Sequence, residues 1–512
     1  MGVAEAIGVR PVADLLAKNS ARYGGGLAFA DDMREVGWSE LRRRTGGLAV
    51  GLAVERGTRV AFCLDNGVEL VEGLLATVRA AAVGVPLPPR ATHTELAQLL
   101  ADCDPAVVVT DQRRLPRIAG MVAGRPVRLV VTGEGELPKG VAHFEELVTG
   151  GRSRPRDDLG LDEPAWLLYT SGTSGTSTAA VSSQRSALWS SFACYLPRLG
   201  LTHTDRVLAP LPLAHTYAHS LCVLGTTAAG ASARITAGTD PAELVRTVGE
   251  FEPTVLGGVP LTFRRLLDAG LGTVPSLRVC VTAGAPSGAE LREEVERRFG
   301  APLLDGYGST ETCGKIAMES LTGPRVRGGS GTPLPGMDVR LVDPDSGLDS
   351  GEGEIWVRGP GMMLGYHNRP GTGADAAGDG WYRTGDLGRL GAGGSLTVTG
   401  RLGDRIVRGG ENVDPAEVER VLCELPGVRD AAVVARPHPQ LGEVPVAFVV
   451  PARASLDPAA LLRGCATVLS AHKVPEEILF TPAVPRTAAG KPRRAVLRET
   501  LTERPARPGP PA

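Results

Sequence analysis

The sequence predicts an α/β and α+β protein with two domains. We expect a large N-terminal domain of mixed sheets flanked by helices plus a small β-barrel-like part, followed by a small mobile α+β C-terminal domain. A chain of 512 residues is too long for one core. Up to about residue 299, helix-like and strand-like stretches alternate, which is typical of parallel sheets covered by helices. From about residue 331, short turn-rich segments predict antiparallel strands instead.

The individual elements follow from the spacing of apolar residues. In the first part of the chain the expected helices are 12–23, 69–82 and 260–271, and the expected strands are 58–64, 106–110, 254–256 and 277–282. The expected antiparallel strands lie within 339–343, 353–359 and 395–400. After residue 400 we expect a helix at 415–424, strands at 431–437 and 445–451, and a helix at 458–469. We therefore place the N-terminal domain at residues 1–402, the C-terminal domain at 403–502 and a disordered tail at 503–512.

Composition excludes several classes of protein. The chain has 55 basic and 57 acidic residues, so it lacks the bulk positive charge of many nucleic-acid binders. Its eight cysteines form no CxxC pair, which argues against a disulfide framework or a structural zinc site. No apolar run reaches the roughly 18–20 residues of a membrane helix. We expect a cytoplasmic enzyme, monomeric or homodimeric, without a membrane or nucleic-acid partner. Only five of the basic residues are lysine, so each one merits examination.

A loop rich in glycine, serine and threonine follows an apolar strand. Residues 169–175 read Tyr-Thr-Ser-Gly-Thr-Ser-Gly, directly after Ala-Trp-Leu-Leu at 165–168. Backbone N–H groups and hydroxyls in such a loop can hold phosphate oxygens. The alternative is a flexible linker. The loop lacks the Gly-Lys-Ser/Thr ending of a Walker A sequence.

Four further stretches carry groups that a nucleotide would need. Residues 305–311 read Asp-Gly-Tyr-Gly-Ser-Thr-Glu and combine a ring for a purine, a hydroxyl for a phosphate and a carboxylate for a divalent metal. Residues 381–386 place a carboxylate in a turn, where it can bind two ribose hydroxyls. Residues 400–413 lie at the proposed domain boundary, and residues 485–491 form a glycine-hinged loop that presents a lysine.

In this order and at these spacings the five motifs resemble those of the adenylate-forming (ANL) superfamily. This superfamily includes acyl-CoA and aryl-CoA ligases, firefly luciferase and the adenylation domains of peptide synthetases, and the resemblance covers about residues 12–498. Its members first join a carboxylate to ATP, giving acyl-AMP and pyrophosphate. The small domain then rotates and a thiol displaces AMP. The resemblance implies ATP or the AMP moiety of an acyl-adenylate, CoA, and Mg²⁺ if adenylation occurs.

The resemblance also implies roles for single residues. Tyr307 would stack on adenine, and Asp386 with Arg401 would bind the ribose hydroxyls. Thr310 would bind the α-phosphate and Glu311 would hold magnesium. The implied nucleotide-binding residues are Thr170, Ser171, Gly172, Thr173, Ser174, Gly175, Ala283, Gly284, Ala285, Asp305, Gly306, Tyr307, Gly308, Thr310, Asp386 and Arg401.

Two further residues complete the implied catalytic set. Lys491 would bridge the substrate carboxylate and the α-phosphate, where it would stabilise charge that develops during adenylation. His215 would lie beside the acyl carbonyl and the thiol tunnel. The implied catalytic residues are Lys491, His215, Thr310 and Glu311. A rival hypothesis makes His203, His215 and His219 zinc ligands, but no further ligand has suitable spacing.

The segment 408–413 looks like the acyl-CoA ligase version of its motif. Glycines there would let the pantetheine arm of CoA pass close to the backbone, and the implied CoA-binding residues are Arg408, Gly409, Gly410 and Glu411. The aspartate that binds the amino group in peptide synthetases is absent from 215–225. CoA is therefore favoured over a carrier protein. The hinge position is Gly403, where the family usually has Asp or Lys.

The segments that line the acyl pocket in relatives carry mostly small residues here. They are Ala214, Tyr217, Ala218, Gly257, Gly258 and Ala283. Small linings leave volume, so we expect a bulky, largely apolar carboxylic acid of secondary metabolism, such as a polycyclic natural product. The alternative is that these residues only allow close strand packing.

The phosphate loop departs from the family. After its last glycine the family continues x-Pro-Lys-Gly, whereas this chain has Thr176, Ser177, Thr178 and Ala179. The family lysine offsets charge on the β- and γ-phosphates, which ATP has and acyl-AMP lacks. Its loss could cost about 1.5–3 kcal/mol, or about one to two decades in rate.

Three hypotheses about function follow. The protein could have lost efficient adenylation, and could convert a preformed acyl-adenylate from a separate adenylating enzyme into a CoA thioester. It could instead be a complete ATP-dependent acyl-CoA ligase. Finally, it could be a non-catalytic relic that binds AMP or an acyl ligand, against which the retained motif residues argue.

Overall fold

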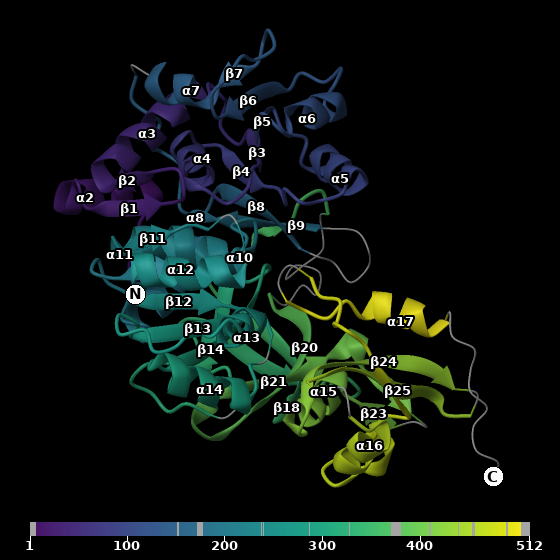
Figure 1. The fold of residues 1–512 in the computed structure, drawn as a ribbon. Helices are drawn as coiled ribbons and strands as arrows, with labels where there is room; N and C mark the ends of the chain where they lie inside the picture. Colours follow the sequence, from purple (N-terminus) through teal and green to yellow (C-terminus); the bar gives the residue numbers. More distant parts are fainter. Residues whose placement is uncertain are drawn as a thin grey trace.

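The computed structural model describes residues 7–150, 153–170, 178–236, 238, 240–285, 287–326, 328–369, 380–408, 411–438, 440–452, 456–487 and 490–502. Within these residues the strands form four sheets. Two large sheets with mostly parallel centres are covered by helices, and a four-stranded sheet and a smaller α+β unit follow along the chain (Figure 1). This arrangement confirms the predicted fold class.

The nine-stranded sheet carries most of the motif residues. Its strands are β1 (Leu27–Ala30), β2 (Glu35–Gly37), β10 (Arg206–Leu208), β11 (Ser232–Arg234), β12 (Val255–Gly258), β13 (Val279–Ala283), β14 (Leu303–Ser309), β15 (Gly314–Met318) and β16 (Thr332–Pro333). They lie in the order β16-β15-β14-β13-β12-β10-β11-β1-β2, parallel from β14 to β1 and antiparallel at both edges. Parallel strands end on the same edge of a sheet, so the segments that follow β12, β13 and β14 lie together there.

The eight-stranded sheet holds both ends of the phosphate loop. Its strands are β3 (Arg59–Cys63), β4 (Val83–Pro86), β5 (Val107–Asp111), β6 (Arg128–Thr132), β7 (Ala142–His143), β8 (Pro164–Thr170), β9 (Thr178–Ser183) and β19 (Gly365–Tyr366). Their order is β19-β9-β8-β4-β3-β5-β6-β7. The centre is parallel, whereas β9 pairs antiparallel with both β8 and β19. The loop therefore connects two neighbouring antiparallel strands.

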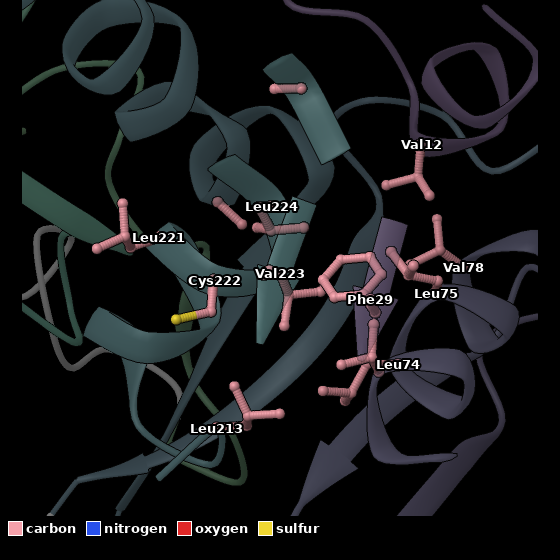
Figure 2. Close-up of a cluster of buried hydrophobic side chains, with 14 of the residues drawn as sticks. Val12, Phe29, Leu74, Leu75, Val78, Leu213, Leu221, Cys222, Val223 and Leu224 are labelled. Carbon is pink, nitrogen blue, oxygen red and sulfur yellow. The ribbon is translucent and has the colours of Figure 1, made fainter. Parts of the chain in front are cut away.

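Helices cover these two sheets. They are α2 (Val12–Tyr23), α3 (Trp38–Gly51), α4 (Val68–Arg79), α5 (His93–Cys103), α6 (Leu115–Met121), α7 (Phe144–Gly150), α8 (Gln184–Ser190), η1 (Ser191–Tyr195), α9 (Leu196–Arg198), α10 (Thr216–Ala218), η2 (His219–Gly225), α11 (Thr226–Ala229), α12 (Pro241–Phe251), α13 (Pro260–Asp268) and α14 (Ala289–Phe299). Figure 2 shows Phe29 of β1 among side chains of α4 and η2, including Leu75 and Val223. One apolar core thus joins elements of both sheets, at the dense packing typical of protein interiors.

Two of the helical runs contain π-helical turns. The π segments η1 and η2 continue α8 and α10 without a break, because the joining residues keep helical backbone angles. The two runs contact each other, and the hydroxyls of Tyr195 and Ser220 lie 2.9 Å apart. Such turns are frequent at functional sites. The second run carries His215 at its N-terminus and Tyr217 in its first turn.

The chain after residue 331 builds the remaining two sheets. The four-stranded antiparallel sheet has the order β17-β18-β20-β21, with β17 (Asp338–Val342), β18 (Glu352–Arg358), β20 (Tyr382–Leu390), the 3₁₀ turn η4 (Ala392–Gly394) and β21 (Leu396–Arg401). The C-terminal unit contains β22 (Ile406–Arg408), β23 (Glu411–Val413), α15 (Pro415–Glu424), β24 (Val428–His438), β25 (Gly442–Pro451), α16 (Pro458–Ala466), η6 (Ala471–Lys473), β26 (Glu477–Phe480) and α17 (Arg494–Thr502). A 3₁₀ turn, η5 (Leu402–Asp404), connects β21 to β22.

The predicted elements are present with small shifts of their ends. Helices α2 and α15 have the predicted bounds, and β24 and β25 contain the two predicted C-terminal strands. Helix α4 is shorter than expected because Ala81, with φ of 56°, leaves the helical conformation. All eight cysteines are free thiols. Among the described helices, none is long and apolar enough to cross a membrane.

Candidate active site

Three motif residues from separate strands form a hydrogen-bonded group. The phenol of Tyr307 in β14 donates to Oδ2 of Asp386 in β20, at 2.7 Å. Nε of Arg401 in β21 pairs with Oδ1 of the same carboxylate at 2.9 Å. Burial and the nearby carboxylate raise the pKa of Tyr307 well above its ordinary value, so the phenol keeps its proton. The carboxylate is therefore held from two sides, and its side chain is 13% exposed.

The structure corrects the predicted surroundings of one of these residues. Asp386 was expected in a turn, but it lies inside β20 and pairs in register with Arg401 of β21. A carboxylate is disfavoured in a strand, and the opposite charge directly across the ladder compensates for it. Tyr307 lies within β14, which continues to Ser309. The ring therefore has a rigid position in the sheet.

A second carboxylate lies in the turn between β14 and β15. Oε1 of Glu311 accepts a hydrogen bond from the phenol of Tyr366 at 3.0 Å, and the hydroxyls of Tyr366 and Tyr382 are 3.3 Å apart. Burial raises the pKa of Tyr366 to about 12. Sequence reasoning missed both tyrosines, although tyrosine is scarce in this chain. Thr310, beside Glu311, uses its carbonyl to accept from the N–H of Cys313 at 3.0 Å.

Lys491 lies where the C-terminal unit meets these carboxylates. The pKa of Lys491 is lowered, mainly because the surrounding protein displaces water from the ammonium and to a smaller extent by the positive charge of Arg401. The carboxylates of Asp386 and Glu311 act in the opposite direction and raise the pKa. The side chain nevertheless keeps contact with solvent, so the carboxylates act on an ammonium that remains accessible. A Cβ on the neighbouring Gly490 would lie 3.4 Å from Cγ2 of Val259. The loop that carries Lys491 thus contacts the segment between β12 and α13.

The ends of the phosphate loop lie opposite each other in the eight-stranded sheet. Thr170 and Thr178 are cross-strand partners, and their hydroxyls are 2.9 Å apart. The predicted residues Ser171, Gly172, Thr173, Ser174 and Gly175 lie outside the described residues.

The other predicted nucleotide-binding residues lie along β13 and β14. Ala283 ends β13, and Gly284 follows with φ of 90°, which favours glycine. The carboxylate of Asp305 is buried and accepts from the hydroxyl of Ser287 at 2.7 Å, and burial raises its pKa to about 6. Its side chain is therefore engaged in the protein interior. The remaining predicted positions are Ala285 after β13, and Gly306 and Gly308 within β14.

The three histidines of the zinc hypothesis have different neighbours. The ring of His203 stacks on Tyr23, with centroids 4.8 Å apart. The ring of His219 is buried and packs edge-on against Trp166 at 5.0 Å, and burial lowers its pKa to about 3. Burial also lowers the pKa of His215, which therefore stays neutral near pH 7. In the described parts of the chain, no group of three or more His, Cys, Asp or Glu side chains could hold a metal ion.

The predicted acyl-pocket residues divide between two faces of β12. A Cβ on Gly257 would meet Leu221, Ala209 and the hydroxyl of Tyr217, which places Gly257 beside α10. A Cβ on Gly258 would instead meet Thr262 and Phe263 of α13. Successive residues of a strand point to opposite faces, so only the first glycine faces Tyr217. Ala218 is buried at the end of α10, and Ala214 is buried just before its N-cap His215.

The predicted CoA-binding residues lie in the C-terminal unit. The guanidinium of Arg408 donates to the carbonyl of Val474 at 3.0 Å and pairs with Glu476 at 2.6 Å. Glu411 approaches Nδ1 of His472 at 3.3 Å. Gly409 and Gly410 lie outside the described residues.

The predicted hinge lies in the turn η5. A Cβ on Gly403 would meet no atom within 4 Å, so open space surrounds the position. The neighbouring Asp404 pairs with Arg494 of α17 at 3.1 Å.

An aromatic ring, a doubly held carboxylate, a second carboxylate and an ammonium come together from two parts of the chain. The family model described as AMP-binding enzyme matches residues 16–367, and that of the AMP-binding enzyme C-terminal domain matches residues 417–491. The chain belongs to the AMP-binding enzyme family, which confirms the resemblance to the adenylate-forming superfamily.

Relatives with known names cover most of the chain. It is 34% identical to a feruloyl-CoA synthase of Amycolatopsis sp., over 89% of this chain and 91% of the relative. It is 37% identical to a naringenin synthase of Pestalotiopsis fici over 91% of this chain, but spans 18% of that relative, and it spans 19% of a chalcone synthase of Aspergillus candidus. The chain thus spans about a fifth of these two longer curated relatives. The structure of ATP-bound MatB from Rhodopseudomonas palustris has a TM-score of 0.86 at 31% identity, covering 96% of this chain and 99% of that one.

Proposed function

We propose that this protein forms a CoA thioester from a bulky carboxylic acid through an acyl-adenylate, and that its own adenylation step is weakened. In the retained step the CoA sulfur attacks the acyl carbonyl carbon, and the carbon–oxygen bond to the phosphate of AMP breaks. AMP leaves with the electron pair, and the thiol proton passes to a base. A separate adenylating enzyme would supply the acyl-adenylate.

The observation that carries this proposal is the residue at position 178. The family has a lysine there, which offsets charge on the β- and γ-phosphates. Here Thr178 begins β9, and its hydroxyl lies 2.9 Å from that of Thr170 across the loop. No cation is therefore available at this position for phosphates that are present in ATP and absent from acyl-AMP.

By contrast, the chain retains the groups that the family uses to bind an acyl-adenylate. Asp386, oriented by Tyr307 and Arg401, can accept hydrogen bonds from both ribose hydroxyls. The ring of Tyr307 can contact the adenine base. Lys491, whose main role in the family is in adenylation, can also contact the phosphate of a bound acyl-adenylate. His215, neutral because burial lowers its pKa, can accept the thiol proton.

The residues present also fit a magnesium ion. Mg²⁺ is usually held by one or two carboxylates together with phosphate oxygens, and Glu311 offers one oriented carboxylate beside the hydroxyl of Thr310. When bound, the ion would neutralise phosphate charge during adenylation.

We further propose that residues 403–502 rotate about Gly403 between the two half-reactions, relative to residues 1–402. Arg408 pairs with Glu476 and Glu411 approaches His472, both inside the C-terminal unit. After the rotation, Arg408 and Glu411 would approach CoA together with Gly409 and Gly410. The family relationship supports this rotation, and the open space around Gly403 permits it.

A complete ATP-dependent ligase is the second candidate. The position of Lys491 beside Asp386 and Glu311 favours it, because the main role of this lysine in the family is in adenylation. The relatedness to a feruloyl-CoA synthase and to ATP-bound MatB also supports it.

The two candidates are separated by thioester formation measured by mass spectrometry across a panel of bulky carboxylic acids. One arm contains the free acid, ATP, Mg²⁺ and CoA, and the other contains the preformed acyl-adenylate and CoA. We expect product mainly in the second arm. Equal rates in the two arms would establish the complete ligase, and binding without product in either arm would point to a non-catalytic relic.

A further inference from the structure

A lysine with no role in the steps above is buried in β15. Lys315 is 3% exposed, and its strand is otherwise apolar. The backbone N–H of Lys315 donates to the hydroxyl of Ser190 in α8 at 2.7 Å. This bond anchors the strand at the residue, so the side chain starts from a fixed point.

The side chain runs along β14 and ends over an aromatic ring. Lys315 pairs in register with Gly308, yet its Cδ and Cε are 3.4 Å from where a Cβ on Gly306 would lie. The side chain therefore extends back along β14, away from the turn that carries Glu311. Nζ ends 3.8 Å from the ring centroid of Tyr217.

Asp305 acts on this ammonium from beyond ion-pair distance, and no described carboxylate pairs with it directly. Among the described residues, no carboxylate lies within 4.0 Å of Nζ. Asp305 also accepts a hydrogen bond from the hydroxyl of Ser287, and Glu319 forms a two-bond ion pair with Arg292. A cation over a ring face gains far less than burial of an unpaired charge costs.

The surroundings of Nζ connect it to the acyl end of the site. Tyr217 donates its hydroxyl to the carbonyl of Val281 at 2.9 Å and also faces Gly257, so it lies over the strands whose ends carry the adenylate motifs. Thr310 and Glu311 lie beyond Gly308 in the turn after β14, on the opposite side from the direction of the Lys315 side chain. An acyl chain that runs from the turn of Glu311 past Gly306 would follow the same direction as the Lys315 side chain.

We propose that Lys315 binds an oxygen acceptor at the end of the acyl group that is remote from the reacting carboxylate. This inference rests on the proposed function and narrows its substrate class. The small pocket residues predict a largely apolar acid. The proposal instead gives the acid a hydroxyl, carbonyl or second carboxylate at the end opposite the carboxylate that forms the thioester. Lys315 is in this account a specificity-determining residue.

The test uses non-hydrolysable acyl-sulfamoyl adenosines, which mimic acyl-adenylates, and measures their binding by calorimetry. The three probes carry the cinnamoyl, 4-hydroxycinnamoyl and 4-carboxycinnamoyl groups, which differ only at the remote end. We expect wild type to bind at least one oxygen-bearing probe about tenfold more tightly than the cinnamoyl probe. Tighter binding of the 4-hydroxycinnamoyl probe would indicate a neutral acceptor, and tighter binding of the 4-carboxycinnamoyl probe would indicate an anionic one.

The variants are Lys315→Met and Lys315→Gln, with Lys18→Met as the matched control at an exposed position on α2. Both changes at position 315 should remove the preference, and the control should keep it. The proposal is overturned if wild type binds the three probes equally or binds none of them, or if the preference survives in a folded position-315 variant. Equal binding of the three probes by wild type overturns the proposal even if neither variant folds.

The binding ratio is independent of turnover, so the two proposals can fail separately. Discrimination among the probes without any thioester formation would contradict the proposed function and leave the role of Lys315 standing. Thioester formation without discrimination among the probes would support the proposed function and contradict the role of Lys315.

Discussion

Two lysines of this chain meet different surroundings. Lys491 is accessible to solvent, and the carboxylates of Asp386 and Glu311 act on it. Lys315 is buried, and its Nζ lies over the ring of Tyr217. The pKa of both lysines is lowered, that of Lys315 by burial and that of Lys491 by the surrounding protein and Arg401. The comparison teaches that a lysine close to carboxylates, such as Lys491, can serve chemistry common to a family. A buried lysine without an ion-paired carboxylate, such as Lys315, can instead bind one particular ligand, as we propose.

The comparison is tested most strongly by removing a carboxylate from the surroundings of Lys491. Asp386→Asn should lower kcat/KM for thioester formation from a preformed acyl-adenylate by about 100-fold. The reason is that Arg401 loses its partner and the ribose loses a charged acceptor. Steady-state kinetics check this, with Asp338→Asn, an exposed carboxylate on β17 paired with Arg358, as the control. A change below about threefold would mean that Asp386 does not contact the substrate.

Removing the first lysine should separate the two half-reactions. Lys491→Met should lower product formation from free acid and ATP by about 100-fold, because charge that develops during adenylation loses its partner. Product formation from preformed acyl-adenylate should fall by less than about fivefold. Single-turnover measurements in both arms check the split. Equal losses in the two arms would contradict the assignment of Lys491 to adenylation.

Removing the second lysine should act on stability. Burial lowers the pKa of Lys315 to about 8 from 10.5, so between these values the unfolded chain binds more protons and stability rises with pH. Lys315→Met should therefore be more stable than wild type by about 1–3 kcal/mol near pH 7. The difference should shrink toward about pH 10, where the lysine is neutral in the fold. Denaturant unfolding at the two pH values checks this, and a variant less stable than wild type near pH 7 would show that the protein already compensates the charge.

Sequence reasoning predicted most of the helices and strands, but it missed contacts between residues on separate strands. Local periodicity predicted helices α2 and α15 with their observed bounds, because amphipathic spacing is a property of neighbouring residues. It did not predict that Asp386 lies in a strand, because the compensating charge on Arg401 comes from the next strand. The bond from Tyr366 to Glu311 was missed for the same reason, since it joins segments far apart in the chain.

Lys315 was also missed, although the scarcity of lysine was visible. Nothing in the sequence around residues 314–318 shows that the side chain turns back along β14 or ends on Tyr217. Such pairings depend on how strands and helices pack, and a single sequence does not encode them locally.

The central claim is that the altered loop weakens adenylation and leaves thioester formation intact. The most direct test is the rate of pyrophosphate–ATP exchange in wild type, Thr178→Lys and the uncharged control Thr178→Met, with the acid that the thioester panel selects. The account predicts slow exchange in wild type and the control, and about tenfold or faster exchange in Thr178→Lys, with thioester formation from acyl-adenylate changed by less than about threefold. Rapid exchange in wild type, or no gain from the lysine, would contradict it.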